Sequence, residues 1–347
     1  MSQQRIKSFD VLKGMMIFLV ILGHLSLFSY KSEAMSLPVI HKIFAEFHVP
    51  VFFFVAGMFF GIDKRNNFSE KSLFVLQKAV YLLLPSLFFY VLYNASHNLN
   101  PMAFIYFGFG KYWFLPTLFY AMFMVSVVDI LSSLLSKNET NKRICGNVVL
   151  LLSLFCISYY VLFVNTGYKN GILQISNTTA YLPIFAAGYL CRIYKEQGEK
   201  VLKNQILITV AIVIVFVSIM LSRYRESIPE TIYSLIYIIR VYFLTFICLS
   251  CFFHYQGRFE KNNWFNNFFA LVGKYTLPIY VLHYFFLPDL AWLRKIMGDD
   301  STVLVYLILI VIAVAIICLC LIFTKVISRS DFLGHYLLGQ KSDRFKY

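Results

Sequence analysis

Charged residues are scarce in this sequence. Asp, Glu, Lys and Arg account for 14% of its 347 residues, whereas hydrophobic residues account for 59%. Ordinary soluble domains contain about 25% charged and about 45–50% apolar residues. A soluble protein could not bury this apolar fraction, so the composition excludes a soluble enzyme and indicates an integral membrane protein. The 37 Phe and 24 Tyr suit lipid-facing and interfacial positions.

Acidic residues are scarcer than basic ones, with 17 Asp and Glu against 31 Lys and Arg and a formal net charge of +14. In a soluble protein this excess would point to nucleic acid. Here the basic residues fall in short segments between apolar runs, where they orient membrane helices and contact anionic lipid headgroups. We therefore expect the lipid bilayer, and not nucleic acid, as a partner.

Several common catalytic motifs are missing. The sequence lacks the HExxH of zinc peptidases, the GxSxG of serine hydrolases and the HxxxxD of glycerolipid acyltransferases. Its seven cysteines include one CxxC pair, Cys248 and Cys251, which lies within an apolar run and has no second pair. Packing is the expected role of these cysteines, with a zinc or redox site as the alternative. We expect no metal.

Long polar segments are also missing, which leaves no room for a soluble domain. A spanning helix needs about 20 mostly apolar residues. The sequence contains ten such runs, at 9–30, 39–60, 72–93, 112–135, 146–164, 179–194, 204–222, 232–253, 269–290 and 302–327. We predict an all-α integral membrane protein with about ten transmembrane helices, formed by a single domain over 1–347 and without a soluble extracytoplasmic domain.

The distribution of basic residues predicts the orientation of these helices. With the N-terminus inside, most Lys and Arg fall in the inner segments, as the positive-inside rule requires. Both termini are then cytoplasmic, which fits an even number of spans. The first run holds Asp10 and Lys13 and lacks a small-residue cleavage site, so we expect it to remain as a membrane helix.

Ionisable residues inside the apolar runs are candidate functional residues, because such groups are costly in lipid. Lys13 and His24 lie on one face of the first helix, since 11 residues make three turns plus about 20°. Asp10 lies on the same face, one turn before Lys13. The alternative is a structural Asp10–Lys13 pair near the interface, with Lys13 extending its charge to water.

Three further ionisable residues lie at a depth similar to that of His24: His48, Arg240 and His283. All belong to the outer half of their predicted helices. His24, His48 and Arg240 lie about 9–14 Å from the outer ends of theirs. A neutral histidine is suited to remove a hydroxyl proton, and an arginine can stabilise an oxyanion. Each residue alone reads as a structural polar group, but the four together predict a buried catalytic site.

Four stretches carry a family resemblance, and they follow one another as RIKSFDVLKGMMIFLVILGH, FHVPVFFFVAGMFF, KYWFLPTLFYAMF and VGKYTLPIYVLH. Together they resemble the acyltransferase-3 family of membrane O-acyltransferases, in particular its fucose 4-O-acetyltransferase-like branch. Lys13 and His24 match the basic residue and histidine that this family spaces by ten positions, and His283 matches its ninth-helix histidine. The usual Ser-Gly after the aromatic run of the second helix is Ala56-Gly57 here, and Lys78 alone remains of a basic cluster.

The resemblance implies an acyl-CoA donor, most simply acetyl-CoA, and a cell-surface glycan or lipid-linked sugar as acceptor, in the bacterial inner membrane. Binding of the donor phosphates is then assigned to cations at the inner face, namely Lys13, Lys64, Arg65, Lys71 and Lys78, with Asp10 orienting Lys13. Polysaccharide-assembly proteins are possible partners. The leading alternative is a transporter or flippase, for which the expected internal repeat is missing; a polysaccharide polymerase would need a larger outer loop.

Overall fold

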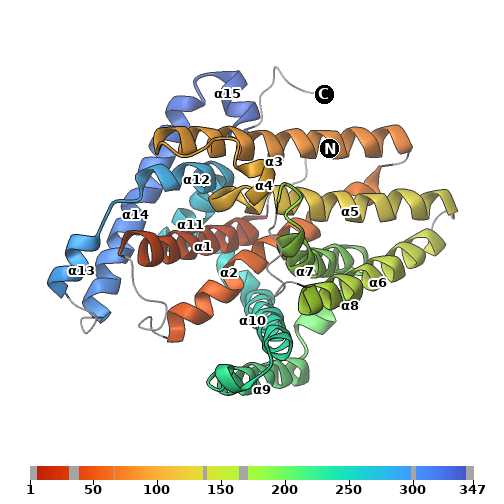
Figure 1. Cartoon of the computed structure of the whole chain (residues 1–347). Coiled ribbons are helices and arrows are strands. Elements are labelled where there is room, and N and C mark those ends of the chain that lie inside the picture. The colour runs from red at the N-terminus through yellow and green to blue at the C-terminus, as the bar shows by residue number, and fades with distance from the viewer. Residues whose placement is uncertain are drawn as a thin grey trace. The chain divides into compact units, whose positions relative to one another are not determined.

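The computed structural model describes residues 6–30, 39–65, 67–135, 139–163, 171–297 and 302–340. Across these ranges all regular secondary structure is helical (Figure 1). Eight helices in the described part are long and apolar enough to cross a membrane: Lys7–Ser29, Ile43–Lys64, Phe68–Ser96, Phe114–Leu134, Lys142–Phe163, Gln205–Ser222, Glu230–Phe259 and Val303–Ile327. The predicted all-α, multi-pass membrane fold is confirmed.

Two of the ten predicted spans are not among these eight. The run 179–194 lies in α7 (Ile175–Ile193), a continuous helix of 19 residues, which is about 28 Å long at 1.5 Å per residue. This length approaches the hydrocarbon thickness of a bilayer, about 30 Å. What lowers the mean hydropathy of α7 is the polar sequence of its first turns, Ser176 to Thr179.

The prediction of one continuous helix over 269–290 is wrong. The segment is divided into α11 (Trp264–Lys274), α12 (Thr276–Leu282) and a short 3₁₀ turn, His283–Phe286. Pro278 explains the break, because it has no N–H to donate to the preceding turn and its ring disfavours a helical residue before it. Within the first turn of a new helix the same residue is tolerated, and this is where α12 places it.

The described chain forms two compact units, which divide α2 (Val39–Met58) and α10 (Glu230–Phe259) between them. The first unit, residues 1–49 and 254–347, contains α1 (Lys7–His24), α11, α12, α13 (Ala291–Met297), α14 (Thr302–Ile327) and α15 (Asp331–Tyr336). Whether the whole chain acts as a single domain stays a prediction.

In the first unit, α1 and α11 pack backbone against backbone. Gly14 of α1 lies against the carbonyl group of Phe269, and Gly273 of α11 lies against that of Asp10. A Cβ atom on either glycine would collide with the facing carbonyl oxygen. Small residues at such crossings let membrane helices approach closely. This crossing fixes α1 beside the segment that leads into α12 and His283.

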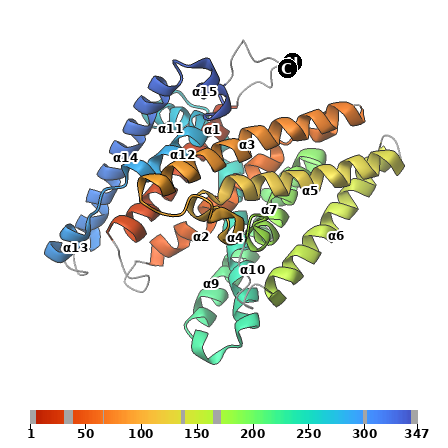
Figure 2. The same ribbon diagram turned by 45° about the horizontal axis from the view of Figure 1, so that its top comes forward.

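The second unit, residues 50–253, is built around α3 (Phe68–Ser96), α5 (Phe114–Leu135), α6 (Glu139–Phe163) and α7. Helices α5, α6 and α7 pack against one another (Figure 2). Gly57 at the end of α2 lies against the carbonyl of Phe185 in α7, and Gly188 lies against that of Phe54. The remaining helices of this unit are α4 (Phe104–Phe107), α8 (Lys195–Leu202), α9 (Gln205–Ser222) and most of α10.

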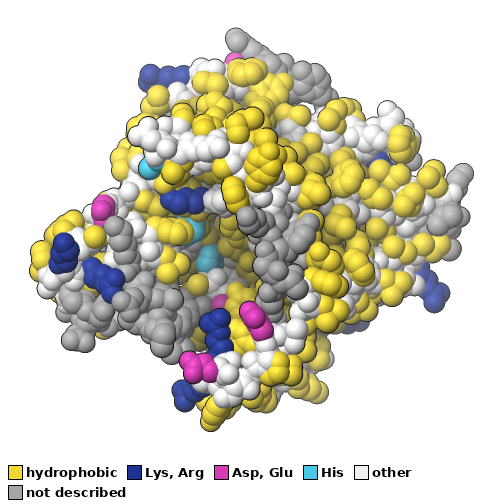
Figure 3. Space-filling model, viewed as in Figure 1, with side chains coloured by type: hydrophobic (Ala, Val, Ile, Leu, Met, Phe, Trp, Pro, Cys, Tyr) yellow, Lys and Arg dark blue, Asp and Glu magenta, His cyan; other side chains and the backbone are white. Residues whose placement is uncertain are grey.

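The surface of these helices is apolar. Hydrophobic side chains cover most of the face of α5 and α6 seen in Figure 3. The exposed hydrophobic residues of α6 include Leu151 and Phe155, which are 65% and 66% exposed. In a water-soluble protein such a continuous apolar surface would be an aggregation or interaction site. On membrane helices it is the surface that contacts lipid.

Candidate active site

Two of the predicted catalytic residues, His24 and His283, lie in contact. His24 Nδ1 is 2.9 Å from His283 Nε2, and the two imidazole rings are stacked with centroids 5.2 Å apart. Tyr284 completes the cluster, with its ring 5.0 Å from that of His24 and its hydroxyl 3.4 Å from His24 Nε2. His283 is fully buried and His24 is partly exposed. A pair of residues 259 positions apart in sequence thus forms one site.

The hydrogen bonds determine which nitrogen atoms carry protons. His283 Nδ1 is 3.1 Å from the carbonyl oxygen of Ile279, which can only accept, so Nδ1 of His283 must donate. In a neutral imidazole the other nitrogen, Nε2, is then an acceptor for the Nδ1–H of His24. This leaves the lone pair on His24 Nε2. The arrangement therefore orients His24 as a base, with His283 as the residue that fixes its tautomer.

Local sequence features place both histidines. His24 ends α1, and the next residues, Leu25–Ser29, form a π-helical turn, a rare element that often marks functional sites. The end of this turn is held by a hydrogen bond of 3.1 Å from Leu290 N to the carbonyl of Ser29. His283 follows the short helix α12, so the break between α11 and α12 brings its ring to this position.

His48 and Arg240 are both buried, at 7% exposure each. His48 Nδ1 is 2.7 Å from the carbonyl oxygen of Phe44, one turn earlier in α2, so it too has its proton on Nδ1 and its lone pair on Nε2. Arg240 belongs to the second unit, where it donates to the hydroxyl of Ser222 and lies 5.5 Å from the ring centre of Tyr237. Their membership of one site with His24 stays a prediction.

Asp10 and Lys13 form an ion pair of 2.7 Å on α1. The preceding turn is bound to α11 and to the loop before it: Lys7 Nζ donates to Asn267 of α11 at 2.7 Å, and the N–H of Ser8 donates to Glu260 of the loop at 2.9 Å. Lys13 retains 29% side-chain exposure, so its ammonium group is only partly shielded by Asp10.

A group of cations lies where α2 ends and α3 and α7 meet. Arg65 stacks on the ring of Phe74 at 4.0 Å, and Lys78 lies 5.1 Å from the same ring. Arg192 donates to Asp63 at 3.1 Å and Arg65 donates to the carbonyl of Gly61. Burial, and then the guanidinium of Arg192, lower the pKa of Arg65, against the effect of Asp63 and Glu70. We call Arg65, Lys78 and Arg192, with the exposed Lys64, the cation cluster.

Lys71 differs from the residues of the cation cluster. Its ammonium is buried and lies 2.6 Å from a carboxylate oxygen of Asp129 in α5, and the other oxygen of Asp129 accepts from Tyr189 of α7 at 3.1 Å. A buried ion pair with a further hydrogen bond is a structural link between helices. The positive charge of Lys71 is thereby paired within the protein, and we assign this residue to the packing of α3, α5 and α7.

Sequence reasoning did not single out Tyr284, Arg192 or Tyr189. Tyr284 could have been suspected from its position next to His283, and Arg192 from its place at the end of an apolar run. Tyr189 gives no such sign, because an aromatic residue in a membrane helix is most often a packing residue. Within the described residues, no group of three or more His, Cys, Asp or Glu is arranged to hold a metal ion.

The comparison with known families identifies the class of enzyme. The acyltransferase-3 family, described as an acyltransferase domain, matches residues 6–322. The chain belongs to this family, and it is a membrane acyltransferase. The match extends over both compact units and includes every predicted site residue. Neither the curated proteins nor the solved structures contain a match to this chain.

Proposed function

We propose that this acyltransferase is an O-acetyltransferase of the bacterial inner membrane. It transfers an acyl group from acyl-CoA to a hydroxyl of a cell-surface polysaccharide or of its lipid-linked sugar precursor, as in the fucose 4-O-acetyltransferase-like branch. The observation that carries the proposal is the hydrogen-bonded pair of His24 and His283. Transfer to a hydroxyl needs a base at the oxygen, and this pair presents one.

His24 is the base in this proposal. Its Nε2 takes the proton of the acceptor hydroxyl as the oxygen attacks the acyl carbon, and it later gives a proton to the leaving sulfur. His283 accepts from Nδ1–H of His24 throughout, which keeps the lone pair on Nε2 and stabilises the imidazolium, as an orienting acceptor does in catalytic triads. Arg240, which can only donate, is the proposed partner of the developing oxyanion. His48, whose Nδ1–H is bonded to the carbonyl of Phe44, has an Nε2 that can only accept and is proposed as a further proton acceptor of the site.

The cation cluster fits the donor. Coenzyme A carries several phosphate charges, and arginine and lysine are their usual partners. Arg65, Lys78 and Arg192 bring positive charges close together, with Asp63 as the paired acid of Arg192, so an anionic ligand would relieve their repulsion. Acyl-CoA supplies the activated thioester. Lys13 is the proposed contact on α1, where Asp10 orients it.

The test is the substitution of the base. In purified enzyme reconstituted in liposomes, His24→Ala should reduce acetyl transfer from acetyl-CoA by about 10²–10⁴-fold, the usual contribution of a positioned base. His254→Ala, which changes an exposed histidine of α10, should act like wild type. Near-normal transfer by His24→Ala at equal membrane abundance would remove the catalytic role, and solute movement without any acylated product would favour a transporter.

A further inference from the structure

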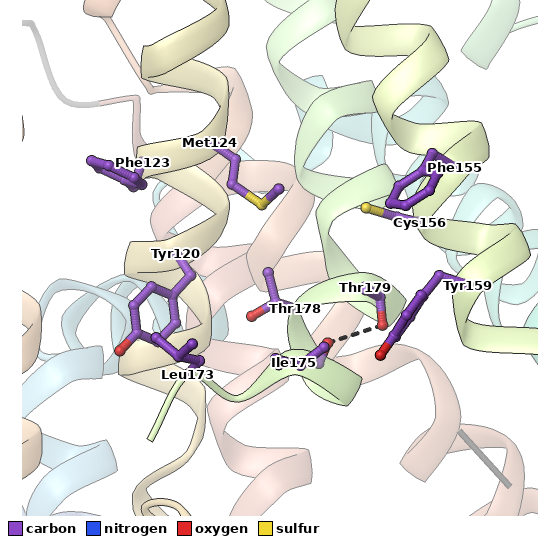
Figure 4. A pocket seen from close by; sticks show the side chains of 10 residues that line it. All are labelled: Tyr120, Phe123, Met124, Phe155, Cys156, Tyr159, Leu173, Ile175, Thr178 and Thr179. Carbon is purple, nitrogen blue, oxygen red and sulfur yellow. Dashed lines mark hydrogen bonds between the residues drawn. The ribbon is translucent and has the colours of Figure 1, made fainter. Parts of the chain in front are cut away.

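A cavity between α5, α6 and α7 has none of the residues proposed for catalysis in its lining. Its volume is about 410 Å³, within the range of about 300–1,000 Å³ typical of ligand sites. Figure 4 shows Tyr120, Phe123 and Met124 of α5 on one side and Phe155, Cys156 and Tyr159 of α6 on the other. The first turns of α7, with Ile175, Thr178 and Thr179, lie between them, and Leu173 lies next to Tyr120. The lining is almost entirely hydrocarbon and aromatic, so the site suits an apolar ligand.

One polar atom in this lining points to a more specific ligand. Thr178 is 6% exposed, and among the described residues its hydroxyl has no hydrogen-bond partner. Its neighbour Thr179 donates to the carbonyl of Ile175 at 2.9 Å, which is the ordinary way for a threonine to be satisfied in a helix. A buried hydroxyl without a partner is unfavourable, so a ligand oxygen at Thr178 would be stabilised.

The cavity opens toward the lipid-facing side of these helices. Phe123, Phe155 and Leu173 belong to its lining and are 45%, 66% and 55% exposed. Cys156 lies in the interior and is 1% exposed. A hydrocarbon chain could therefore pass from the bilayer into the cavity between apolar side chains. Only the end of the chain that is attached to its polar group would lie at Thr178.

The position of the cavity along α7 excludes the donor phosphates as its ligand. Thr178 lies in the first turn of α7, whereas Arg192 of the cation cluster lies in its last turn. Fourteen residues of helix separate them by about 21 Å. The two ends of one helix thus serve chemically different ligands, one anionic and one apolar. In an acyl transfer, an acceptor carried on a lipid would supply such an apolar ligand.

We propose that this cavity holds the lipid anchor of the acceptor, a long hydrocarbon chain that enters between α5 and α6. The oxygen that links this chain to its phosphate headgroup accepts a hydrogen bond from the hydroxyl of Thr178. The proposal rests on the proposed function, because it takes the acceptor to be lipid-linked. It adds a binding site in α5–α7 and a residue, Thr178, that recognises the linkage and not the sugar.

The test is photoaffinity labelling in nanodiscs with two diazirine probes, a long-chain polyprenyl phosphate and a phosphatidylglycerol. The polyprenyl phosphate should label peptides from 114–135, 142–163 or 171–193, and unlabelled polyprenyl phosphate, but not added phosphatidylglycerol, should compete. Cys156→Phe fills the cavity and should reduce labelling about tenfold, as the loss of a few buried methylene contacts predicts. Cys318→Phe, at an exposed cysteine of α14, should leave labelling unchanged.

Thr178 provides a second pair of variants if Cys156→Phe does not accumulate. Thr178→Val keeps the size of the side chain but loses the hydroxyl, and should reduce labelling about three- to tenfold, the value of one hydrogen bond. Thr178→Ser should retain labelling. Equal labelling by both probes, or labelling insensitive to both Thr178→Val and Cys156→Phe, would overturn the proposal in favour of bulk lipid. His24→Ala should label normally, which separates this test from that of the catalytic base.

Discussion

At the scale of single residues, the chemistry depends on which nitrogen of each imidazole carries the proton. His283 Nδ1 faces the carbonyl of Ile279, so it must donate, and the proton pattern of His24 follows from it. The identity of the base is therefore set by a main-chain oxygen one turn away from His283. An aspartate, the usual partner in soluble hydrolases, would place a formal charge in this buried position.

This arrangement predicts a difference between two substitutions of His283. His283→Leu removes the acceptor for His24 Nδ1–H and should lower kcat about 10²-fold or more, because the wrong tautomer of His24 becomes available. His283→Gln keeps a side-chain oxygen that can accept this hydrogen, and should restore part of the rate. KM for acetyl-CoA should stay within about twofold in both, since no ground-state contact with the donor is lost.

The measurement is the acetyl-transfer rate of the reconstituted variants across pH. A positioning role predicts that His283→Gln recovers rate with a pH profile like that of wild type, whereas His283→Leu does not. Equal loss in both variants, together with equal loss of thermal stability, would show that His283 acts only in packing.

At the scale of helices, the sequence predicted most of the fold because apolar runs report lipid contact directly. The eight confirmed spans are of this kind. The run 269–290 was one of the two weakest predicted spans because Pro278 interrupts it, but an average over about 20 residues does not show where the helix divides. The contact of His24 with His283 agrees with the prediction that both lie at a similar depth in the membrane. Such a depth can be predicted by counting residues along each helix.

Pairings between distant helices were not predictable. Lys71 reads as one of several inner cations, and only the fold shows that Asp129, 58 residues later, pairs with it. Sequence spacing carries information within a helix and almost none between helices. For the same reason the cavity at Thr178 has no signal in the sequence, where its lining residues look like ordinary lipid-facing or packing positions.

The glycine crossing of α1 and α11 leads to a prediction about stability. Gly14→Ala adds a Cβ that collides with the backbone of Phe269, so the helices must separate. We expect a loss of about 1–3 kcal/mol, the usual cost of overpacking, and a lower melting temperature in detergent. Gly257→Ala, on α10 where nothing lies within 4 Å of the added atom, should be neutral or slightly stabilising, because alanine favours helix.

Activity distinguishes this crossing from a simple packing contact. If separation of α1 from α11 also moves His24 away from His283, the transfer rate of Gly14→Ala measured well below its melting temperature should fall. A variant that is as stable and as active as Gly257→Ala would show that the close approach of the two helices is dispensable.

At the scale of the whole molecule, the excess of basic residues predicts which side of the membrane meets the donor. The cation cluster lies on the segments that the charge distribution assigns to the cytoplasm, where acyl-CoA is made. We expect Lys64→Gln combined with Arg65→Gln to raise KM for acetyl-CoA about tenfold, with kcat changed less than about threefold, because ground-state contacts are lost. Lys71 should be left unchanged in this experiment, because its removal would leave the buried carboxylate of Asp129 without its cationic partner.

The control is Lys195→Gln combined with Lys200→Gln, which removes the same charge from exposed positions of α8. Rates should be measured with acetyl-CoA on one side of sealed vesicles of known orientation. Activity only with donor on the cytoplasmic face, and a changed KM only in the cluster variant, is the expected result. An unchanged KM would assign the donor phosphates to other residues, with Lys13 the next candidate.

The contact between Gly14 and Gly273 also affects what can be learned from related sequences. Each position faces a main-chain carbonyl and not a side chain, so neither can vary to compensate for a change in the other. Homologues should keep both residues constant, and two constant columns of an alignment contain no covariation. Methods that infer proximity from correlated substitutions would then gain nothing from the two glycines, and would have to find this crossing from side-chain contacts beside it, such as that of Phe18 with Phe269.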